Sequence, residues 1–127
     1  TEAITLASII EKEGLEKNKI AGVFINRLRI GMKLQSDPTV IYALGKDYDG
    51  DIKRKDLRID NPYNTYRYKG LPPGPISIVS EESLEAALNP EETDFLYFVS
   101  MNNGFHKFSK NLTEHNEAVL KYQINER

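Results

Sequence analysis

The chain has 127 residues, a length typical of one domain with one modest hydrophobic core. Its net charge is −2 and it carries no block of Lys and Arg, so its composition gives no indication of nucleic-acid binding. It contains no cysteine, which excludes disulfides, thiolate metal sites and a Cys nucleophile. We expect a single domain over residues 1–127, without an apolar run near the roughly 20 residues that cross a bilayer.

The first predicted helix, over residues 2–13, carries a carboxylate on its apolar face. At about 100° per residue, one stripe of this helix collects the aliphatic residues Leu6, Ile9 and Ile10. Glu13 falls near the middle of that stripe. A carboxyl group among aliphatic side chains loses solvation, so its pKa should rise and it can act as a general acid near neutral pH. The alternative is that Glu13 lies at a frayed helix end and points to water.

Two further helices are predicted in the first half of the chain. Residues 16–30 carry a second apolar stripe, and the short link to the first helix favours a packed helical pair. Asp37, followed by a proline, predicts the N-cap of a helix over residues 37–44. Capping accounts for Ser36 and Asp37, whereas Gln35 has no structural explanation; Asp37 is also a possible second carboxylate for glycoside chemistry.

Residues 46–78 lack periodicity and are rich in Tyr, Pro, Gly, Asn and Asp. A loop of this length is more typical of a functional or ligand-facing segment than of a simple connection. One part of this loop combines aromatic faces with amide and hydroxyl groups and would suit a glycan cleft: Tyr63, Asn64, Thr65 and Tyr66. Tyrosines also cover cores while their hydroxyls stay hydrated. The stiff run Pro72, Pro73 and Gly74 either walls a groove or simply crosses between two elements.

The remaining pattern predicts a helix capped by Ser80 that ends at residue 87 or 88, a strand over 95–99, a turn at 102–104, a returning strand over 105–109 and a last helix over 113–123. His106 on the hairpin can face a cleft, while His115 is interpreted as a surface or packing residue. Neither has a partner at zinc-ligand spacing, so we expect no metal site. The whole pattern predicts an α+β domain, with a helical N-terminal half packed with a small antiparallel hairpin and a C-terminal helix, and the long loop lining a cleft.

Several blocks of the chain resemble, in order, the endolytic murein transglycosylase family, also called YceG-like. They are LASIIEKE at 6–13, AGVFINRLRIGM at 21–32, LQSDPTVIY at 34–42, YNTY at 63–66, GLPPGPI at 70–76, ALNP at 87–90 and FLYFV at 95–99. Together they span nearly the whole chain, which makes the resemblance far more specific than any one motif.

The resemblance implies a bacterial cell-wall lyase, without a cofactor, that cuts glycan strands internally. It implies cleavage of the β-1,4 bond between N-acetylmuramic acid and N-acetylglucosamine with formation of a 1,6-anhydro end, and it puts the catalytic carboxyl on Glu13. The candidate substrate-binding residues are Gln35, Ser36, Asp37, Tyr63, Asn64, Thr65, Tyr66, Pro72, Pro73, Gly74 and His106. The chain departs from the pattern of related enzymes at Gly14, where a Ser or Thr is common, and at Phe105, where the family often has Gly.

Family members are membrane-anchored by an N-terminal helix and carry a LysM-like region before the catalytic domain. The resemblance thus implies that residues 1–127 are a catalytic fragment lacking both, from a protein on the extracytoplasmic face of the bacterial membrane beside the cell-wall synthesis machinery. The implied partner is the peptidoglycan glycan strand. Two alternatives remain open: a muramidase-type hydrolase in which Asp37 activates water, and a peptidoglycan-binding module without turnover.

Overall fold

The computed structural model describes residues 1–124 and shows an α+β domain, as predicted. Its regular elements are α1 (Glu2–Glu13), α2 (Lys17–Ile30), α3 (Asp37–Leu44), α4 (Glu81–Leu88), β1 (Tyr97–Ser100), β2 (His106–Ser109) and α5 (Leu112–Val119). Short 3-10 turns η1 (Gly45–Asp47) and η2 (Asp56–Arg58) lie in the long loop, and a π-helical turn η3 (Leu120–Ile124) follows α5. Among these described elements, no helix has the length and apolar character needed to cross a membrane.

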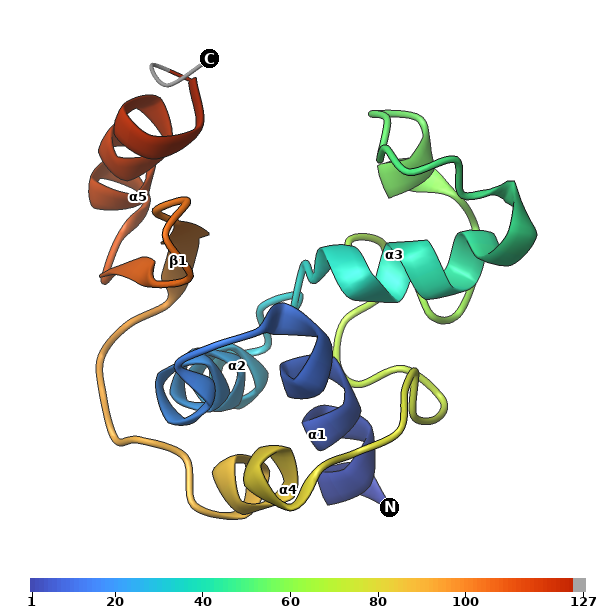
Figure 1. Ribbon diagram of the computed structural model, residues 1–127, viewed down its shortest axis with the longest axis horizontal. Helices are drawn as coiled ribbons and strands as arrows, with labels where there is room; N and C mark the ends of the chain where they lie inside the picture. The colour runs from blue at the N-terminus through green and yellow to red at the C-terminus, as the bar shows by residue number, and fades with distance from the viewer. Residues whose placement is uncertain (125–127) are drawn as a thin grey trace.

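Helices α1, α2 and α4 form the hydrophobic centre of the domain (Figure 1). The predicted stripe on α1 is confirmed, because Leu6, Ile9 and Ile10 are all buried. Glu11 lies outside this stripe, and its side chain contacts the start of α4. Its carboxylate accepts hydrogen bonds from the Ser80 backbone N–H at 3.0 Å and from a serine hydroxyl in α4, which fixes the start of α4 against α1.

Helix α2 is tied to the segment that leads into the hairpin. Gly22 lets this segment approach closely, since a Cβ atom there would lie 2.4 Å from the carbonyl oxygen of Glu91. One turn further on, the Asn26 side chain donates hydrogen bonds to the carbonyls of Thr93 at 2.8 Å and Phe95 at 2.9 Å. These contacts place the hairpin beside the C-terminal half of α2.

Strands β1 and β2 pair antiparallel, with Tyr97 opposite Ser109 and Ser100 opposite His106. The predicted first strand is correct in type but begins two residues later, because the carbonyls of Phe95 and Leu96 accept hydrogen bonds from Asn26 and Arg27 of α2, and only the Leu96 N–H reaches the carbonyl of Ser109. The last helix is capped by Asn111, whose side-chain oxygen accepts a hydrogen bond from the backbone N–H of the residue three positions on.

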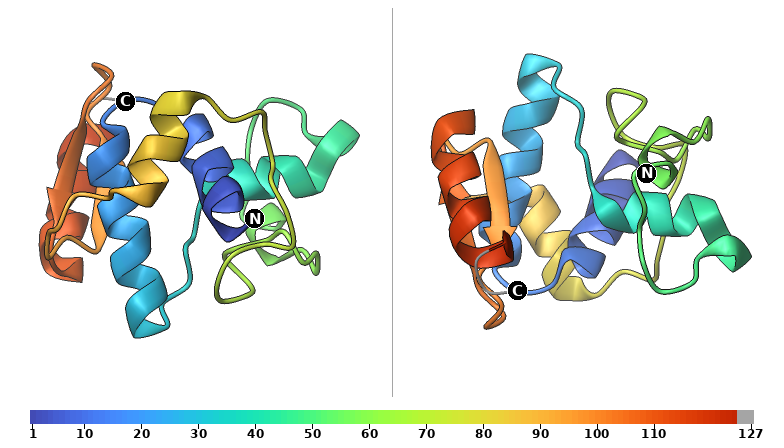
Figure 2. Two further views of the ribbon diagram at one scale, coloured as in Figure 1. Left: turned by 90° about the horizontal axis from the view of Figure 1, so that it is seen from below. Right: turned by 90° about the horizontal axis from the view of Figure 1, so that it is seen from above.

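Helix α3 and the long loop lie on the opposite side of the domain from the hairpin and α5 (Figures 1 and 2). The prediction that Asp37 is the N-cap of α3 is wrong by one position. Ser36 has the extended N-cap backbone and Asp37 is already helical. The side chains of both residues are used elsewhere, because the Ser36 hydroxyl donates to Glu13 and the Asp37 carboxylate accepts from Tyr66.

Candidate active site

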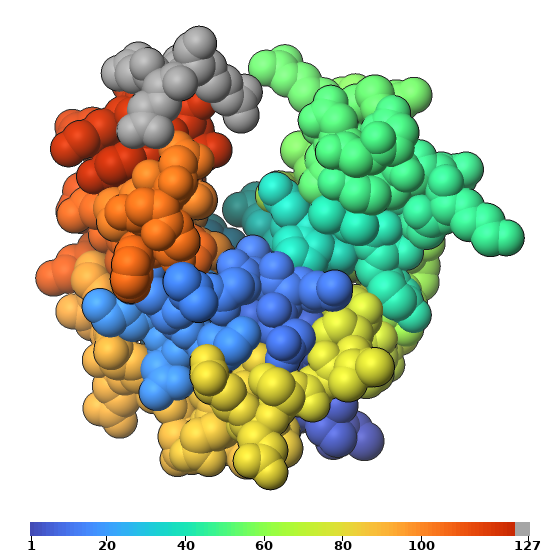
Figure 3. Space-filling model, in the orientation of Figure 1, coloured from blue at the N-terminus to red at the C-terminus, as the bar shows by residue number. Residues whose placement is uncertain are grey.

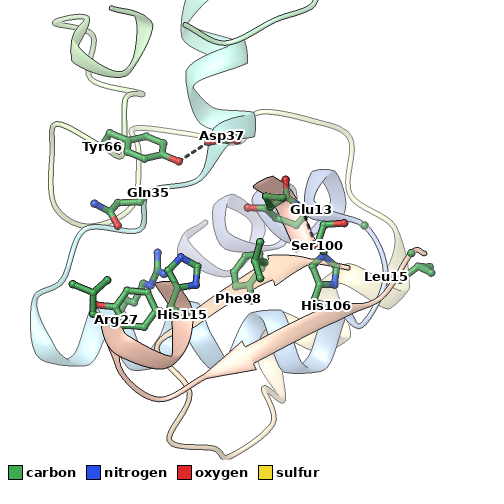
Figure 4. A pocket seen from close by; sticks show the side chains of 16 residues that line it. Glu13, Leu15, Arg27, Gln35, Asp37, Tyr66, Phe98, Ser100, His106 and His115 are labelled. Atoms are coloured by element: carbon green, nitrogen blue, oxygen red, sulfur yellow. Dashed lines mark hydrogen bonds between the residues drawn. The ribbon is translucent and has the colours of Figure 1, made fainter. Parts of the chain in front are cut away.

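A cleft of about 690 Å³ separates the hairpin and α5 from α3 and the loop (Figure 3). Its volume lies within the 300–1,000 Å³ typical of small-molecule sites. Four sequence-predicted site residues line it beside Glu13, from three separate segments of the chain (Figure 4): Gln35, Asp37, Tyr66 and His106. The structure therefore brings the predicted acid and a subset of the predicted binding residues into one place.

Glu13 is the last residue of α1 and is half-buried in the wall of the cleft. Helix periodicity directs it inward, and Gly14, with φ of 103°, turns the chain away immediately afterwards. Its Oε2 accepts a hydrogen bond from the buried Ser36 hydroxyl at 3.0 Å. The pKa of Glu13 is raised to about 7, chiefly by burial; the nearby Asp37 also acts to raise it, whereas the Ser36 hydrogen bond and the charge of Arg27 act in the opposite direction.

Asp37 and Tyr66 form a polar pair on the wall opposite the hairpin. The Tyr66 hydroxyl donates a hydrogen bond to Asp37 Oδ1 at 2.5 Å. Burial raises the pKa of Tyr66, and the hydrogen bond to Asp37 raises it further, so the hydroxyl remains protonated and holds the carboxylate. The Asp37 carboxylate, whose charge raises the pKa of Glu13, is thus kept in a fixed orientation.

His106 borders the cleft from β2 and is oriented by Glu16. Glu16 precedes α2 in a left-handed conformation with φ of 63°, which is unusual for a residue with a side chain. Its Oε1 accepts from the His106 backbone N–H at 2.5 Å and lies 3.2 Å from Nδ1 of the ring. In the tautomer that carries the proton on Nδ1, the ring donates to Glu16 and presents Nε2 as a hydrogen-bond acceptor.

Gln35 is exposed at the cleft and has a left-handed backbone with φ of 51°. Its own N–H donates to the carbonyl of Thr65 at 3.2 Å, and the next residue, Ser36, donates from its N–H to the Thr65 hydroxyl at 2.9 Å. The turn that carries Gln35, Ser36 and Asp37 is therefore held from behind by buried Thr65.

The other predicted sugar-binding residues do not line this cleft. Asn64 is fully buried and its amide nitrogen donates to the carbonyls of Leu57 at 3.0 Å and Ile59 at 2.9 Å, so it shapes the loop from inside. Tyr63 packs against Tyr42 with ring centroids 4.7 Å apart. The predicted proline wall lies elsewhere: Pro72 and Pro73 line a second cavity beside the start of α1, and Gly74 lies against the Tyr63 hydroxyl.

Several cleft residues were not predicted from the sequence, and Arg27 is the most informative of them. Arg27 is only 5% exposed, and its guanidinium lies over the Tyr97 ring at 5.4 Å from the centroid. The same periodicity that identifies Glu13 identifies Arg27, because it lies three residues after Phe24 and four after Val23 on the apolar face of α2. Tyr97, Phe98, Ser100 and His115 complete this side of the cleft, and only the tertiary packing of the hairpin and α5 brings them there.

Comparisons with known proteins agree with this architecture. The sequence profile of the YceG-like family matches residues 1–121. The chain is 54% identical over 122 residues to an endolytic murein transglycosylase of Bacillus subtilis (strain 168), a match that covers 94% of this chain and 34% of the relative. It is 37% identical over 129 residues to the protein of that name in Streptococcus pneumoniae (strain D39), covering 95% of this chain and 23% of the relative.

A crystal structure of a YceG-like protein from Listeria monocytogenes matches with a TM-score of 0.84 and 52% sequence identity, over 90% of this chain and 38% of the other. The chain thus spans about a third or less of the length of the curated relatives that it matches. The family profile covers all of the cleft-forming elements through α5, including Glu13 and the hairpin. The chain belongs to the YceG-like family.

Proposed function

We propose that this domain is an endolytic lytic transglycosylase that cleaves the N-acetylmuramic acid-β-1,4-N-acetylglucosamine bond of peptidoglycan strands. The observation that carries the proposal is the position of Glu13, a carboxyl group half-buried in the cleft with a pKa of about 7. Such a group is populated in both protonation states near neutral pH, as a proton-transfer catalyst requires. The names of the relatives from Bacillus and Streptococcus support the substrate and the reaction.

In the first step, protonated Glu13 donates its proton to the glycosidic oxygen as the bond from this oxygen to C1 of the muramic residue breaks. The leaving N-acetylglucosamine departs with a free 4-hydroxyl group, and positive charge develops on C1 and the ring oxygen. Burial and the negative charge of Asp37 both favour the protonated form of Glu13 that this step uses.

In the second step, the Glu13 carboxylate accepts the proton from the C6 hydroxyl of the same muramic residue. The C6 oxygen bonds to C1, which closes the 1,6-anhydro ring and returns Glu13 to its acid form. The Ser36 hydroxyl stabilises the carboxylate between the two steps, since it donates a hydrogen bond to Oε2 at 3.0 Å. One carboxyl group serves both steps, and no activated water is needed.

The cleft residues Gln35, Asp37, Tyr66 and His106 are the proposed sugar contacts. They provide an amide, a carboxylate, a hydroxyl and a ring nitrogen on two walls of the cleft. To Thr65 and Asn64 we assign support of the walls, because their polar groups are buried in hydrogen bonds to the loop and to the α3 turn. By the family resemblance we also propose an extracytoplasmic location, an N-terminal membrane anchor outside this sequence and association with the cell-wall synthesis machinery.

The test is mass spectrometry of uncrosslinked glycan strands digested with the domain and with its Glu13→Gln variant. Anhydro-muramic ends that are absent with Glu13→Gln are the expected result. Glu82→Gln is a matched control, because the same substitution is then made at an exposed position on α4, outside the cleft. Reducing ends would identify a hydrolase and direct attention to Asp37, whereas binding without any product would identify a non-catalytic module.

A further inference from the structure

The end of the cleft formed by Arg27, Tyr97 and His115 contains a buried positive charge without a carboxylate partner (Figure 4). Arg27 donates from Nε to the carbonyl of Leu96 at 2.7 Å and from Nη1 to the carbonyl of Leu34. These carbonyls satisfy hydrogen-bond donors but do not neutralise the charge. Among residues 1–124, the carboxylates that form ion pairs are bonded to other partners, and none pairs with Arg27.

Arg27 is 5% exposed and borders the cleft, and a guanidinium in such a position is costly to bury unless an anion compensates its charge. The energetic consequence is visible in the pKa of Arg27, which burial lowers. The two carboxyl groups of the same cleft make no direct ion pair with Arg27: Asp37 accepts from Tyr66, and Glu13, whose charge acts on Arg27 without contact, accepts from Ser36. An anion in direct contact with the guanidinium is therefore expected from a ligand.

His115 supplies a second donor at the same end of the cleft. Its ring stacks on Tyr97, with centroids 4.9 Å apart and planes 23° from parallel. Burial, together with the charge of Arg27, lowers the pKa of His115 and keeps the ring neutral. Its Nδ1 is buried and has no hydrogen-bond partner within the described part of the chain. A buried acceptor without a partner costs less than a buried N–H without one, so we assign the proton of the neutral ring to Nε2. Nε2 is then the hydrogen-bond donor of His115.

We propose that Arg27 and His115, with Tyr97 between them, form a subsite for the 3-O-lactyl carboxylate of an N-acetylmuramic residue. The proposal rests on the proposed function, which identifies the ligand as a glycan strand. Of the two alternating sugars, only N-acetylmuramic acid carries a carboxyl group. Arg presents its donors in a planar fork that matches a carboxylate, and the bonds to Leu96 and Leu34 fix the plane of that fork.

The subsite predicts a substrate preference. In strands that bear peptide stems, the lactyl carboxyl is part of an amide bond and has no charge; in stripped strands it is a free carboxylate. A free carboxylate gains a charge-assisted hydrogen bond to Arg27 that an amide cannot make. The domain is therefore expected to bind stripped muramic residues more tightly than amidated ones at this end of the cleft.

The experiment compares peptide-free glycan strands with the same strands after conversion of their lactyl carboxylates to methyl amides. Affinity is measured by calorimetry with the Glu13→Gln variant, which binds without turnover, and KM is measured with the unaltered domain. Amidation is expected to raise both Kd and KM by about tenfold to a hundredfold, with little change in kcat. Equal affinities for the two strands, including no binding of either, would overturn the proposal.

Two substitutions locate the effect. Arg27→Gln retains donors for the two carbonyls but lacks the charge, and His115→Phe retains the ring that stacks on Tyr97 but lacks the donor. Each substitution is combined with Glu13→Gln, and the folding of the double variant is checked by circular dichroism. Each is expected to reduce the preference for strands with free carboxylates. A preference that survives both would place the carboxylate elsewhere. Cleavage of neither strand by the unaltered domain would count against the proposed function alone, because the Kd comparison does not depend on turnover.

Discussion

A carboxyl group held at a raised pKa, as Glu13 is, should reduce the stability of the domain at alkaline pH, and replacing it should restore that stability. The pKa of Glu13 is about 7 in the folded protein against a reference of 4.5, which corresponds to a difference of about 3 kcal/mol between the two protonation states. Water in the cleft reduces this value, so about 2–3 kcal/mol is expected. Because the folded pKa is the higher one, the stabilisation is fully present below pH 4.5 and is lost as the pH rises through 7.

Glu13→Gln carries a neutral side chain of similar shape at every pH, so it does not undergo this loss. Its free energy of unfolding relative to that of the unaltered domain should rise by about 2–3 kcal/mol between pH 4 and pH 8. Urea denaturation followed by circular dichroism measures both proteins at each pH, with Glu82→Gln, exposed on α4, as the matched control. If the difference between Glu13→Gln and the unaltered domain is the same at pH 4 and pH 8, the inference that Glu13 is held as an acid by burial is refuted.

Substitutions at three other positions test the neighbours of Glu13 and His106. Ser36→Ala removes the 3.0 Å hydrogen bond to the Glu13 carboxylate, so the alkaline limb of kcat/KM on uncrosslinked strands should move to higher pH by about one unit. Asp37→Asn removes a charge that raises the pKa of Glu13, so the same limb should move to lower pH while turnover persists; an inactive Asp37→Asn would favour the hydrolase. Glu16→Gln keeps an oxygen for the backbone N–H and ring of His106 and should keep KM, whereas Glu16→Ala should raise KM about tenfold; equal KM values for the two would rule out orientation by Glu16.

The part of the site that lies on helices could be predicted from the sequence. Periodicity alone puts Glu13 on the apolar face of α1, and in the structure its side chain is half-buried in the wall of the cleft. The same rule applied to α2 selects Arg27, so a search for any charged residue on an apolar stripe would have found both groups. Tyr97 and His115 could not be found in this way, because they reach the cleft only through the packing of the hairpin and α5 against α2.

The loop was harder to predict, because a polar side chain can serve either a ligand or the loop itself. Asn64 and Tyr66 lie two residues apart in the same short motif, so nothing in the sequence separates their roles. In the structure the Asn64 amide donates its hydrogen bonds to carbonyls of the loop, whereas Tyr66 reaches the cleft and donates a hydrogen bond to Asp37. A long loop without regular structure must satisfy its backbone groups with side chains, and sequence composition does not reveal which ones are used.

The arrangement around Glu13 suits a carboxyl group that must first give a proton and then take one. Burial and Asp37 stabilise the acid, while Ser36 and Arg27 stabilise the carboxylate, and the opposing effects leave the pKa of Glu13 at about 7. Ser36 and Asp37 are consecutive residues at the start of α3, so a single turn carries one group that lowers the pKa of Glu13 and one that raises it. That turn is held by the buried Thr65 hydroxyl, which accepts from the Ser36 N–H at 2.9 Å. Under the proposed mechanism, the long loop would therefore contribute to catalysis even where it does not touch the cleft, because it fixes the positions of the two groups that balance the protonation of Glu13.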